Sequence, residues 1–548
     1  MDQAKTHPAA SGHSLRHLAG LTAVGLVVFF VRLGAPGLMD PDEGRYAEIA
    51  REMLVLGDWL LPRLNFLPYL EKPPLVYWLT ALSFKTFGFT EWAARLPAAL
   101  SALGSVYLAY ALGRALFGAG AGGYGALVLA TCGGVVVLGR LLTLDMTLTF
   151  FVNLGVGLGY LAWSRNRPGL WPWAYLALAL GALTKGPVAP ALAVLIWGAW
   201  GLMQGRGQWF AWLRWQYVFL AAGLTLPWFL WVSLHYPDFL RFFLWEHHVG
   251  RYAGGAFHAQ SFLYYAPVLL GLFTPWTMLL FWTMRRLWGE AGPDRRFLLL
   301  WFALPLIFFS LSRGKLVPYI LPVFLPLALL VGEALWSAQK AGWPNPGDRW
   351  FTLSLLTWAA AAGLLSVVYV WPTTRLAAAL GQLDYLGPFI PLLLGLLVVI
   401  PLATLIFRRV ELLCLGALAL ALILPGAMER VALQRSPREL GLALREHWRP
   451  GAVLIGWRLY SQGVSFYSGQ PFVILDFPTE LEFGRRLDPQ AGFFVTSPQE
   501  VAALVQSRPA AFIFVKERVL FRVREALGGD FRTLARYRDC LLVTPEGK

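Results

Sequence analysis

Apolar runs of about 17 to 23 residues recur along this chain from about Gly20 to about Ala427. A run of that length, coiled as a helix, crosses roughly 30 Å of hydrocarbon. We count about thirteen such runs. With 57% hydrophobic and 14% charged residues, the chain has more apolar side chains than a soluble core buries. The sequence therefore predicts a polytopic α-helical membrane protein.

Lysine and arginine concentrate in every second loop, which predicts the orientation in the membrane. The positive-inside rule places the basic loops in the cytoplasm: Arg114, Arg165–Arg167, Arg206 with Arg214, Arg285–Arg286, Lys340 with Arg349, and Arg408–Arg409. The alternate loops, of which residues 35–93 and 235–260 are the longest, then face outward and carry nearly every acidic residue that lies near a helix end. The net charge of +15 is part of this signal and implies contact with membrane lipids, not with nucleic acid.

The composition changes near Ser436, and the chain after it has the pattern of a soluble domain. Short apolar stretches typical of strands lie at 452–455, 472–475, 493–495 and 511–515, with helix-like stretches at 438–447, 498–507 and 517–527. This mixture predicts a small α/β domain. We expect a transmembrane catalytic domain over residues 1–435 and a soluble α/β domain over residues 436–548. An odd number of spans places the second domain on the outer face.

The charged run Met39–Glu48 directly follows the first apolar run, and helix capping explains part of it. Asp40-Pro41-Asp42-Glu43 has the pattern of a helix start. Asp40 is then the N-cap, Pro41 takes the first helical position, and Glu43 closes a capping box. We therefore expect structural roles for Asp40 and Glu43.

Asp42 is left without a structural role by that capping pattern. On a helix it shares one face with Arg45 and Tyr46, so a simple ion pair with Arg45 is the structural alternative. A dense charge cluster beside a membrane is costly and usually functional. This favours a functional role for Asp42.

Cations occur at three separate places in the outward loops. Lys72 is a flexible point charge suited to a phosphate, and a snorkelling pair with Glu71 is its structural alternative. Lys185 is a lone cation at an outer helix end, where it also complements the helix dipole. The third place is the segment that contains Arg313, Lys315 and Tyr319. Together these cations predict an anionic ligand held at the membrane surface.

Two further expectations concern Asp145 and a metal ion. Asp145 ends a short outer turn, where an N-cap for the next helix and a role in the site are both open. Glu71 and His258 are the candidate ligands for a divalent metal such as zinc. However, the adjacent His247 and His248 do not have a zinc spacing, and no His-Glu-x-x-His pattern occurs. We expect that no cofactor is required.

Several of these motifs, in this order, resemble the bacterial aminoarabinose transferases. These are the lipid A-modifying members of the protein O-mannosyltransferase-like, C-type glycosyltransferase superfamily. The motifs are Asp40–Glu48, Gly57-Asp58-Trp59, Glu71-Lys72-Pro73, Thr184-Lys185-Gly186, Pro237-Asp238-Phe239 and Gly314-Lys315-Leu316. The resemblance covers most of the membrane region, while the C-terminal segment resembles the family only in position and size. It implies a C-type glycosyltransferase fold in the bacterial inner membrane, with an active site that faces the periplasm.

The resemblance also implies the reaction, which is transfer of 4-amino-4-deoxy-L-arabinose from undecaprenyl phosphate to a lipid A phosphate, a modification that confers polymyxin resistance. Cations that stabilise the leaving polyprenyl phosphate should then dominate catalysis. Asp42 and Asp145 would orient the acceptor or bind the sugar's amino group. The expected catalytic residues are Asp42, Arg45, Lys72 and Asp145. The expected substrate-binding residues are Tyr46, Glu71, Lys185, Arg313, Lys315 and Tyr319.

Two other functions remain open at the level of sequence. A related enzyme that moves another sugar to a protein or glycan hydroxyl would use Asp42 as a general base. A lipid transporter would place its charges at mid-membrane on broken helices in two related halves. Here the charges cluster at one interface and no internal repeat is visible, which favours an enzyme.

Overall fold

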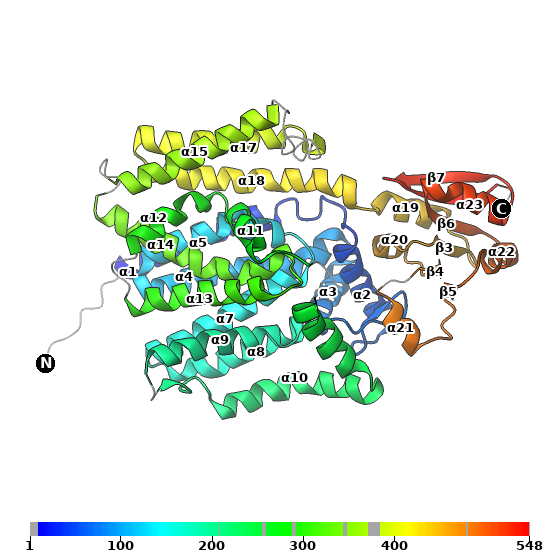
Figure 1. Ribbon diagram of the computed structural model, residues 1–548, viewed down its shortest axis with the longest axis horizontal. Coiled ribbons are helices and arrows are strands. Elements are labelled where there is room, and N and C mark those ends of the chain that lie inside the picture. The colour runs from blue at the N-terminus through cyan, green and yellow to red at the C-terminus, as the bar shows by residue number, and fades with distance from the viewer. Residues whose placement is uncertain are drawn as a thin grey trace. The chain divides into compact units, whose positions relative to one another are not determined.

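The computed structural model describes residues 9–205, 208–254, 259–287, 292–342, 348–370, 384–477 and 480–546, and helices dominate it (Figure 1). The chain divides into two compact units. The first comprises Met1–Leu33, Ala98–Pro227 and Leu244–Met428, and the second comprises Gly34–Pro97, Trp228–Phe243 and Glu429–Lys548. The predicted division at residue 435 stays a prediction, since the second unit combines the C-terminal segment with two earlier segments.

The first unit is built from helices alone, apart from an isolated β-bridge between Ala259 and Gly314, as far as the described ranges extend. Its helices are α1 (Ala9–Phe30), α5 (Ala119–Thr131), α6 (Gly133–Leu138), α7 (Leu144–Ser164), η1 (Pro168–Leu170), α8 (Trp171–Lys185), α9 (Val188–Met203), η4 (Phe262–Tyr264), α11 (Tyr265–Leu272), η5 (Trp276–Leu279), α12 (Leu280–Leu287), α13 (Pro293–Leu311), η6 (Val317–Val323), α14 (Phe324–Lys340), α15 (Arg349–Val370), η7 (Asp384–Leu386) and α17 (Phe389–Phe407). Four more run from one unit into the other: α4 (Glu91–Phe117), α10 (Trp215–His235), η3 (Arg241–Gly254) and α18 (Val410–Arg435).

Within the described ranges, seven helices are long and apolar enough to cross a membrane, or eight if one bent pair is a single span. They are α4, α7, α10, η6 with α14, α15, α17 and α18. This confirms a multi-pass membrane protein, but the predicted count of about thirteen is higher. Several apolar runs form shorter helices, such as α9 with 16 residues, and Phe262–Leu272 bends by 107° into Trp276–Arg286. The alternation of basic loops also places residues 372–386 on the outer face, and most of these lie outside the described residues.

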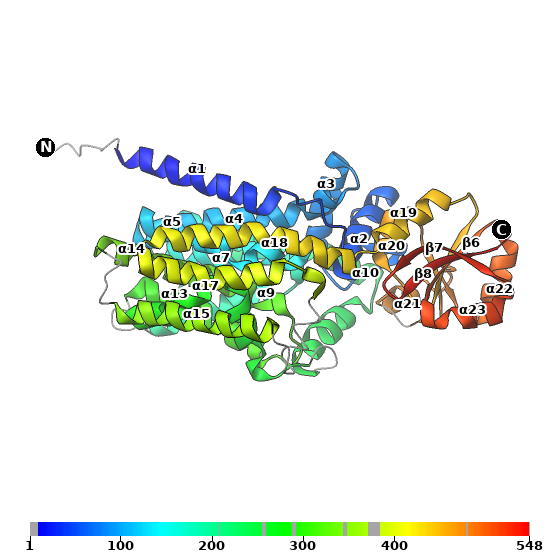
Figure 2. The ribbon, with the colours of Figure 1, turned by 90° about the horizontal axis from the view of Figure 1, so that it is seen from above.

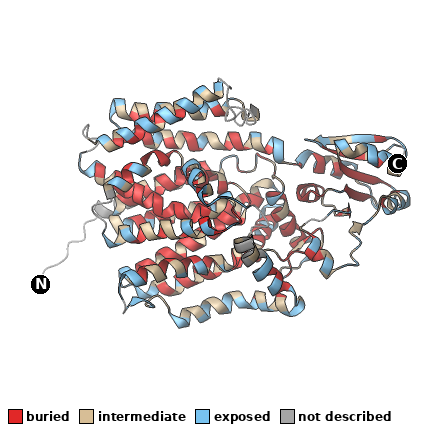
Figure 3. Cartoon of the chain, in the orientation of Figure 1, coloured by how far each residue is buried: buried red, intermediate tan, exposed pale blue. Residues whose placement is uncertain are grey.

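The apolar helices differ in how far the protein buries them (Figure 3). In the best apolar window of each helix, η6 with α14 is 89% buried, whereas α15 and α17, which lie side by side, are each 22% buried (Figures 1 and 2). A helix that remains both apolar and exposed needs an apolar solvent. The helices of the first unit therefore surround a packed centre and present apolar faces to lipid.

The second unit begins with α2 (Asp42–Leu56), the short antiparallel strands β1 (Arg63–Leu64) and β2 (Leu67–Pro68), and α3 (Leu75–Phe87). Gly57 ends α2 in the left-handed conformation at φ 67°, which glycine adopts without steric strain. Its N–H donates to the carbonyl of Leu54. The run Met39–Glu48 thus leads into a well-terminated helix.

The C-terminal segment folds as an α/β sheet with strand order β5-β4-β3-β6-β8-β7. The first four of these strands are parallel, and β8 and β7 add an antiparallel hairpin. Helices cover the apolar residues of the sheet, so its central strands are near-continuous apolar runs. The elements are α19 (Arg438–His447), β3 (Val453–Trp457), α20 (Gln462–Ser468), β4 (Phe472–Leu475), α21 (Glu482–Leu487), β5 (Phe494–Val495), α22 (Pro498–Ser507), β6 (Ala511–Lys516), η8 (Glu517–Val519), α23 (Leu520–Leu527), β7 (Phe531–Tyr537) and β8 (Cys540–Pro545).

The small α/β fold is therefore confirmed, and the predicted helices 438–447 and 498–507 have the observed bounds. The predicted helix 517–527 divides into η8 and α23. The sequence pattern did not predict α20, α21 or the β7–β8 hairpin. Of these, α20 matters most, because it packs against α2 within the second unit.

Candidate active site

Asp40 does not cap α2, which corrects the capping prediction. The helix begins at Asp42, Pro41 takes the N-cap position, and no side chain caps the first turn. The Asp40 carboxylate instead accepts hydrogen bonds from Ser461 Oγ at 2.5 Å and from the Gly463 N–H at 2.9 Å. These donors lie at the start of α20, and they take the place of the N–H groups at the start of α2 as partners of the Asp40 carboxylate. Burial raises the Asp40 pKa to about 6, against the lowering effect of both hydrogen bonds.

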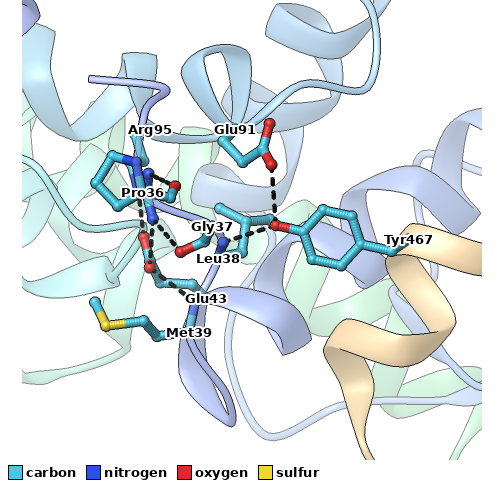
Figure 4. Close-up of polar contacts among 8 residues, drawn as sticks. All are labelled: Pro36, Gly37, Leu38, Met39, Glu43, Glu91, Arg95 and Tyr467. Atoms are coloured by element: carbon cyan, nitrogen blue, oxygen red, sulfur yellow. Dashed lines mark hydrogen bonds and ion pairs between the residues drawn. The ribbon is translucent and has the colours of Figure 1, made fainter. Parts of the chain in front are cut away.

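Glu43 is structural, but through a buried ion pair and not through a capping box with Asp40. Its carboxylate accepts from Arg95 Nε at 2.7 Å and Nη2 at 2.8 Å, and it also accepts from the Met39 N–H at 3.0 Å (Figure 4). Arg95 in turn donates to the carbonyls of Pro36 and Gly37. One guanidinium therefore fixes the loop that leads into α2.

Tyr467 of α20 fixes the same loop from the other side (Figure 4). Its hydroxyl accepts from the Leu38 N–H at 2.7 Å and donates to Glu91 at 3.2 Å. Buried polar groups with all partners satisfied rigidify their surroundings. The first turn of α2 is thus held by side chains from both the start of α4 and the C-terminal sheet segment.

Asp42 and Arg45 form the contact that the helical spacing predicts, but it is loose. Arg45 Nη1 lies 3.5 Å from Asp42 Oδ1, and the Asp42 side chain is 59% exposed. Arg45 Nε lies 3.4 Å from Glu480 Oε1, and Gln462 also donates to Glu480. The guanidinium therefore lies between two carboxylates, neither of which it contacts at full hydrogen-bond strength.

Three phenols surround this cation. The Tyr46 and Tyr77 rings are 6.0 Å apart, and Arg45 lies over the Tyr46 ring at 6.0 Å. The hydroxyls of Tyr69 and Tyr77 are buried, with no hydrogen-bond partner among the described residues. Burial raises the pKa of both phenols, the nearby Glu71 carboxylate raises it further, and Arg45 opposes the shift. Two neutral donors beside a guanidinium suit an oxygen-rich ligand.

Glu71 and Lys72 lie at the edge of this group and are half-buried. Lys72 Nζ donates to the carbonyl of Glu71 at 3.2 Å. The described residues contain no group of three side chains suited to a metal, and His258 lies outside them, so the metal expectation stays a prediction. The second unit thus brings together Asp42, Arg45, Tyr46, Glu71 and Lys72 from the predicted set.

The first unit holds the remaining predicted residues. Asp145 is in the first turn of α7 and Lys185 is the last residue of α8, and Lys185 Nζ contacts Asp145 Oδ1 at 2.5 Å. Asp145 is therefore an ion-pair partner, and α7 has no side-chain N-cap. The Lys185 ammonium also lies 4.5 Å from the centre of the Tyr319 ring, a cation–π contact. These three residues form one cluster.

Lys315, which is predicted to bind substrate, is buried in the structure. Its side chain is only 3% exposed, and its ammonium donates to the carbonyls of Gln260, at 3.1 Å, and Ser312. Burial lowers the Lys315 pKa. Arg313 is exposed, and its N–H donates to the carbonyl of Tyr252. Lys315 thus fixes the loop after α13, while Arg313 keeps an accessible charge.

Sequence reasoning did not single out Glu480, Tyr69 or Tyr77 as site residues. Tyr69 has a local signal, since it lies two residues before Glu71. Glu480 has none, because it lies more than 430 residues after Arg45 in a segment without a recognisable motif. Its contact depends on how the C-terminal segment packs against α2.

Comparisons with known proteins show what this chain resembles in sequence and in fold. Residues 71–232 match a family model described as dolichyl-phosphate-mannose-protein mannosyltransferase. Two proteins of Pseudomonas fluorescens Pf-5, each named undecaprenyl phosphate-α-4-amino-4-deoxy-L-arabinose arabinosyl transferase, are 40% and 39% identical to this chain over 322 and 356 residues. These matches cover 58% and 64% of this chain and 55% and 64% of the relatives, which is less than two thirds of their length.

The structural similarity extends further along the chain. The crystal structure of ArnT from Cupriavidus metallidurans bound to undecaprenyl phosphate matches with a TM-score of 0.85 at 26% identity, over 96% of this chain and 97% of that chain. The apo form of the same protein matches with a TM-score of 0.83 over 98% of both chains. The similarity therefore includes the membrane helices and the C-terminal sheet.

Proposed function

Because this chain belongs to the aminoarabinose transferase family of the protein O-mannosyltransferase-like superfamily, we propose that it transfers 4-amino-4-deoxy-L-arabinose from undecaprenyl phosphate to a lipid A phosphate. The names of the relatives and the undecaprenyl phosphate bound to the similar ArnT structure support this donor. The observation that carries the proposal is Arg45, held loosely between two carboxylates beside two unpaired buried phenols.

The reaction breaks the bond between C1 of the sugar and a phosphate oxygen of the carrier, and the electron pair leaves with that oxygen. An oxygen of the acceptor phosphate forms the new bond to C1. Charge grows on the leaving phosphate, so fixed cations lower the barrier. We assign this role to Arg45 and Lys72, with the Tyr69 and Tyr77 hydroxyls as neutral donors to the same anion.

The acceptor phosphate is already ionised, and its attack requires no general base. The exposed Asp42 carboxylate then orients the acceptor or binds the sugar's ammonium group. For the first unit, we propose that Lys185, paired with Asp145, binds a phosphate group and that Arg313 attracts an anionic substrate. Lys315, which is buried against carbonyls, supports the loop that carries Arg313.

We further propose that these residues face the periplasm from the bacterial inner membrane and that the activity confers resistance to polymyxin. The alternation of basic loops supports this orientation. A reporter fused near Arg445 should then behave as exported. Cytoplasmic reporter activity at that position would reverse the orientation.

The direct test is the composition of lipid A. Mass spectrometry of lipid A from cells with this protein should show aminoarabinose added to phosphate, and cells without it should show none. Cells that carry the Arg45→Gln variant provide the matched control. Unmodified lipid A in the presence of correctly folded wild-type protein would reject this acceptor.

Transfer of another sugar to a hydroxyl is the second candidate, and the match of residues 71–232 to a mannosyltransferase model favours it. In that case Asp42 would act as a general base. The wild-type rate would fall below a pKa that disappears in Asp42→Asn. Aminoarabinose transfer to phosphate predicts that Asp42→Asn loses activity without a change in the shape of the pH profile.

A further inference from the structure

A polar cavity of about 750 Å³ lies in the first unit, at the ends of α7, α8 and α9 that point away from Asp145 and Lys185. Asp145 is in the first turn of α7, and the cavity is lined by Arg165, which follows the last residue of that helix. Twenty residues of helix separate them, which is roughly 30 Å. The cavity is therefore distinct from the cluster of Asp145 and Lys185.

The cavity is lined by aromatic side chains at the ends of apolar helices. Trp163 comes from the end of α7, Trp171 from the start of α8 and Trp200 from the end of α9. Tryptophan gathers where a membrane meets water, at the depth of the lipid headgroups. The cavity thus lies at the level where a phosphate group of a lipid is found.

Arg165 is fixed in this cavity by a short chain of contacts. Its Nη2 donates to Asp294 Oδ2 at 2.7 Å, and the Tyr160 hydroxyl donates to Asp294 Oδ1 at 2.6 Å. The Tyr160 ring stacks on Phe297 at 3.7 Å. A guanidinium has five N–H donors, so the bond to Asp294 orients Arg165 and leaves other N–H groups for a ligand.

Arg214 supplies a second guanidinium from the loop before α10. It lies 6.0 Å from the centre of the Trp171 ring, and its N–H donates to the Tyr175 hydroxyl at 3.2 Å. The same hydroxyl donates to the carbonyl of Trp212 at 2.7 Å. The loop that presents Arg214 is thereby tied to α8.

The charge of the lining is positive, with two guanidinium groups against the carboxylate of Asp294. Guanidinium groups match phosphate oxygens in pairs, and basic pockets between membrane helices on the cytoplasmic side bind anionic lipid headgroups. We infer that this cavity binds a phosphate-bearing anion of the kind that anionic phospholipid headgroups carry, between Arg165 and Arg214. Such a ligand would brace α7 and α8, which carry Asp145 and Lys185 at their other ends.

The test is the affinity of the purified full-length protein for phosphatidylglycerol and for phosphatidylcholine, measured by native mass spectrometry. Wild-type protein should retain phosphatidylglycerol preferentially. Arg214→Gln and Arg165→Gln should each weaken that binding by about tenfold, as expected for the loss of one charged hydrogen bond. Arg409→Gln, an exposed arginine between α17 and α18, is the matched control and should bind like wild type.

A second arm distinguishes the source of the phosphate. Inorganic phosphate that displaces phosphatidylglycerol from wild type, with both binding events lost in Arg214→Gln, would identify a soluble anion as the ligand. If Arg165→Gln leaves Asp294 without a partner and fails to fold, Arg165→Gln/Asp294→Asn removes both charges of the pair. This double variant should bind phosphatidylglycerol more weakly than wild type does. Unchanged phosphatidylglycerol binding in Arg214→Gln and in this double variant would overturn the proposal.

Discussion

Helix α2 carries two pairs of a carboxylate and an arginine three residues apart, Asp42 with Arg45 and Glu48 with Arg51, in two different settings. Arg51 contacts Glu48 through two hydrogen bonds of 2.7 Å, and both side chains are buried. Arg45 lies 3.5 Å from Asp42, whose carboxylate is largely exposed. A buried ion pair persists only when its hydrogen bonds are complete, whereas a loose and open pair can exchange its partner for a ligand. Spacing alone cannot separate these two roles, but geometry can.

The largest expected effect is the loss of the buried pair. Arg51→Ala would leave Glu48 buried without its partner, beside Glu52, whose pKa burial and Glu48 already raise. We expect the free energy of unfolding to fall by about 3–5 kcal/mol. Denaturant unfolding in detergent measures it. Arg458→Ala, which breaks an exposed pair with Asp476, should change it by less than about 1 kcal/mol. Equal losses of unfolding free energy in Arg51→Ala and Arg458→Ala would show that burial does not distinguish these ion pairs.

The Asp145–Lys185 pair combines features of the two pairs in α2, so it tests whether a short contact can still belong to the site. It is short, yet both side chains remain partly exposed and the ammonium also contacts Tyr319. We expect Lys185→Gln to lower the rate of sugar transfer by about 10²–10³-fold, as when a charge-stabilising donor is removed from an active site. A reconstituted transfer assay measures the rate, with the exposed Lys340→Gln as control. Full activity of Lys185→Gln would show that this pair stabilises the fold and takes no part in sugar transfer.

Asp40 should make the second unit sensitive to pH. Its folded pKa of about 6 lies above the ordinary value of 3.8, so the folded state binds more protons between these values. Stability then falls as pH rises from about 4 to about 6, by up to about 3 kcal/mol. The difference in unfolding free energy between wild type and Asp40→Asn should change across this window and be constant above it. A constant difference throughout would show that Asp40 is ionised in the folded state at all these pH values.

Gly44 marks how closely α20 approaches the first turn of α2. A Cβ atom at this position would lie 2.7 Å from the backbone nitrogen of Gly463 and would also meet the Asp40 carboxylate. Gly44→Ala should therefore destabilise the protein by about 1–3 kcal/mol. Gly123→Ala is the control, because a Cβ atom there has open space. A more stable Gly44→Ala variant would show that the two helices separate easily.

The sequence predicts well what local pattern determines. The helices 438–447 and 498–507 and the strand 472–475 follow from apolar periodicity and appear with the predicted bounds. Partners distant in the chain leave no such signal. Asp40 contacts Ser461, Glu43 contacts Arg95, and Arg45 contacts Glu480, so the capping prediction was wrong at Asp40. The burial of Lys315 could not be predicted either, because a position in a loop does not determine exposure.

The most direct test compares Arg45→Gln with Arg51→Gln in one preparation, measuring both sugar transfer and the free energy of unfolding. We predict that Arg45→Gln loses transfer by about 10²–10³-fold but loses less stability than Arg51→Gln, because its ion-pair contacts of 3.5 and 3.4 Å are loose. Arg51→Gln should instead lose stability and retain transfer per folded molecule. Normal transfer by Arg45→Gln, or a loss of transfer that only follows a loss of folded protein, would contradict the role proposed for the open pair.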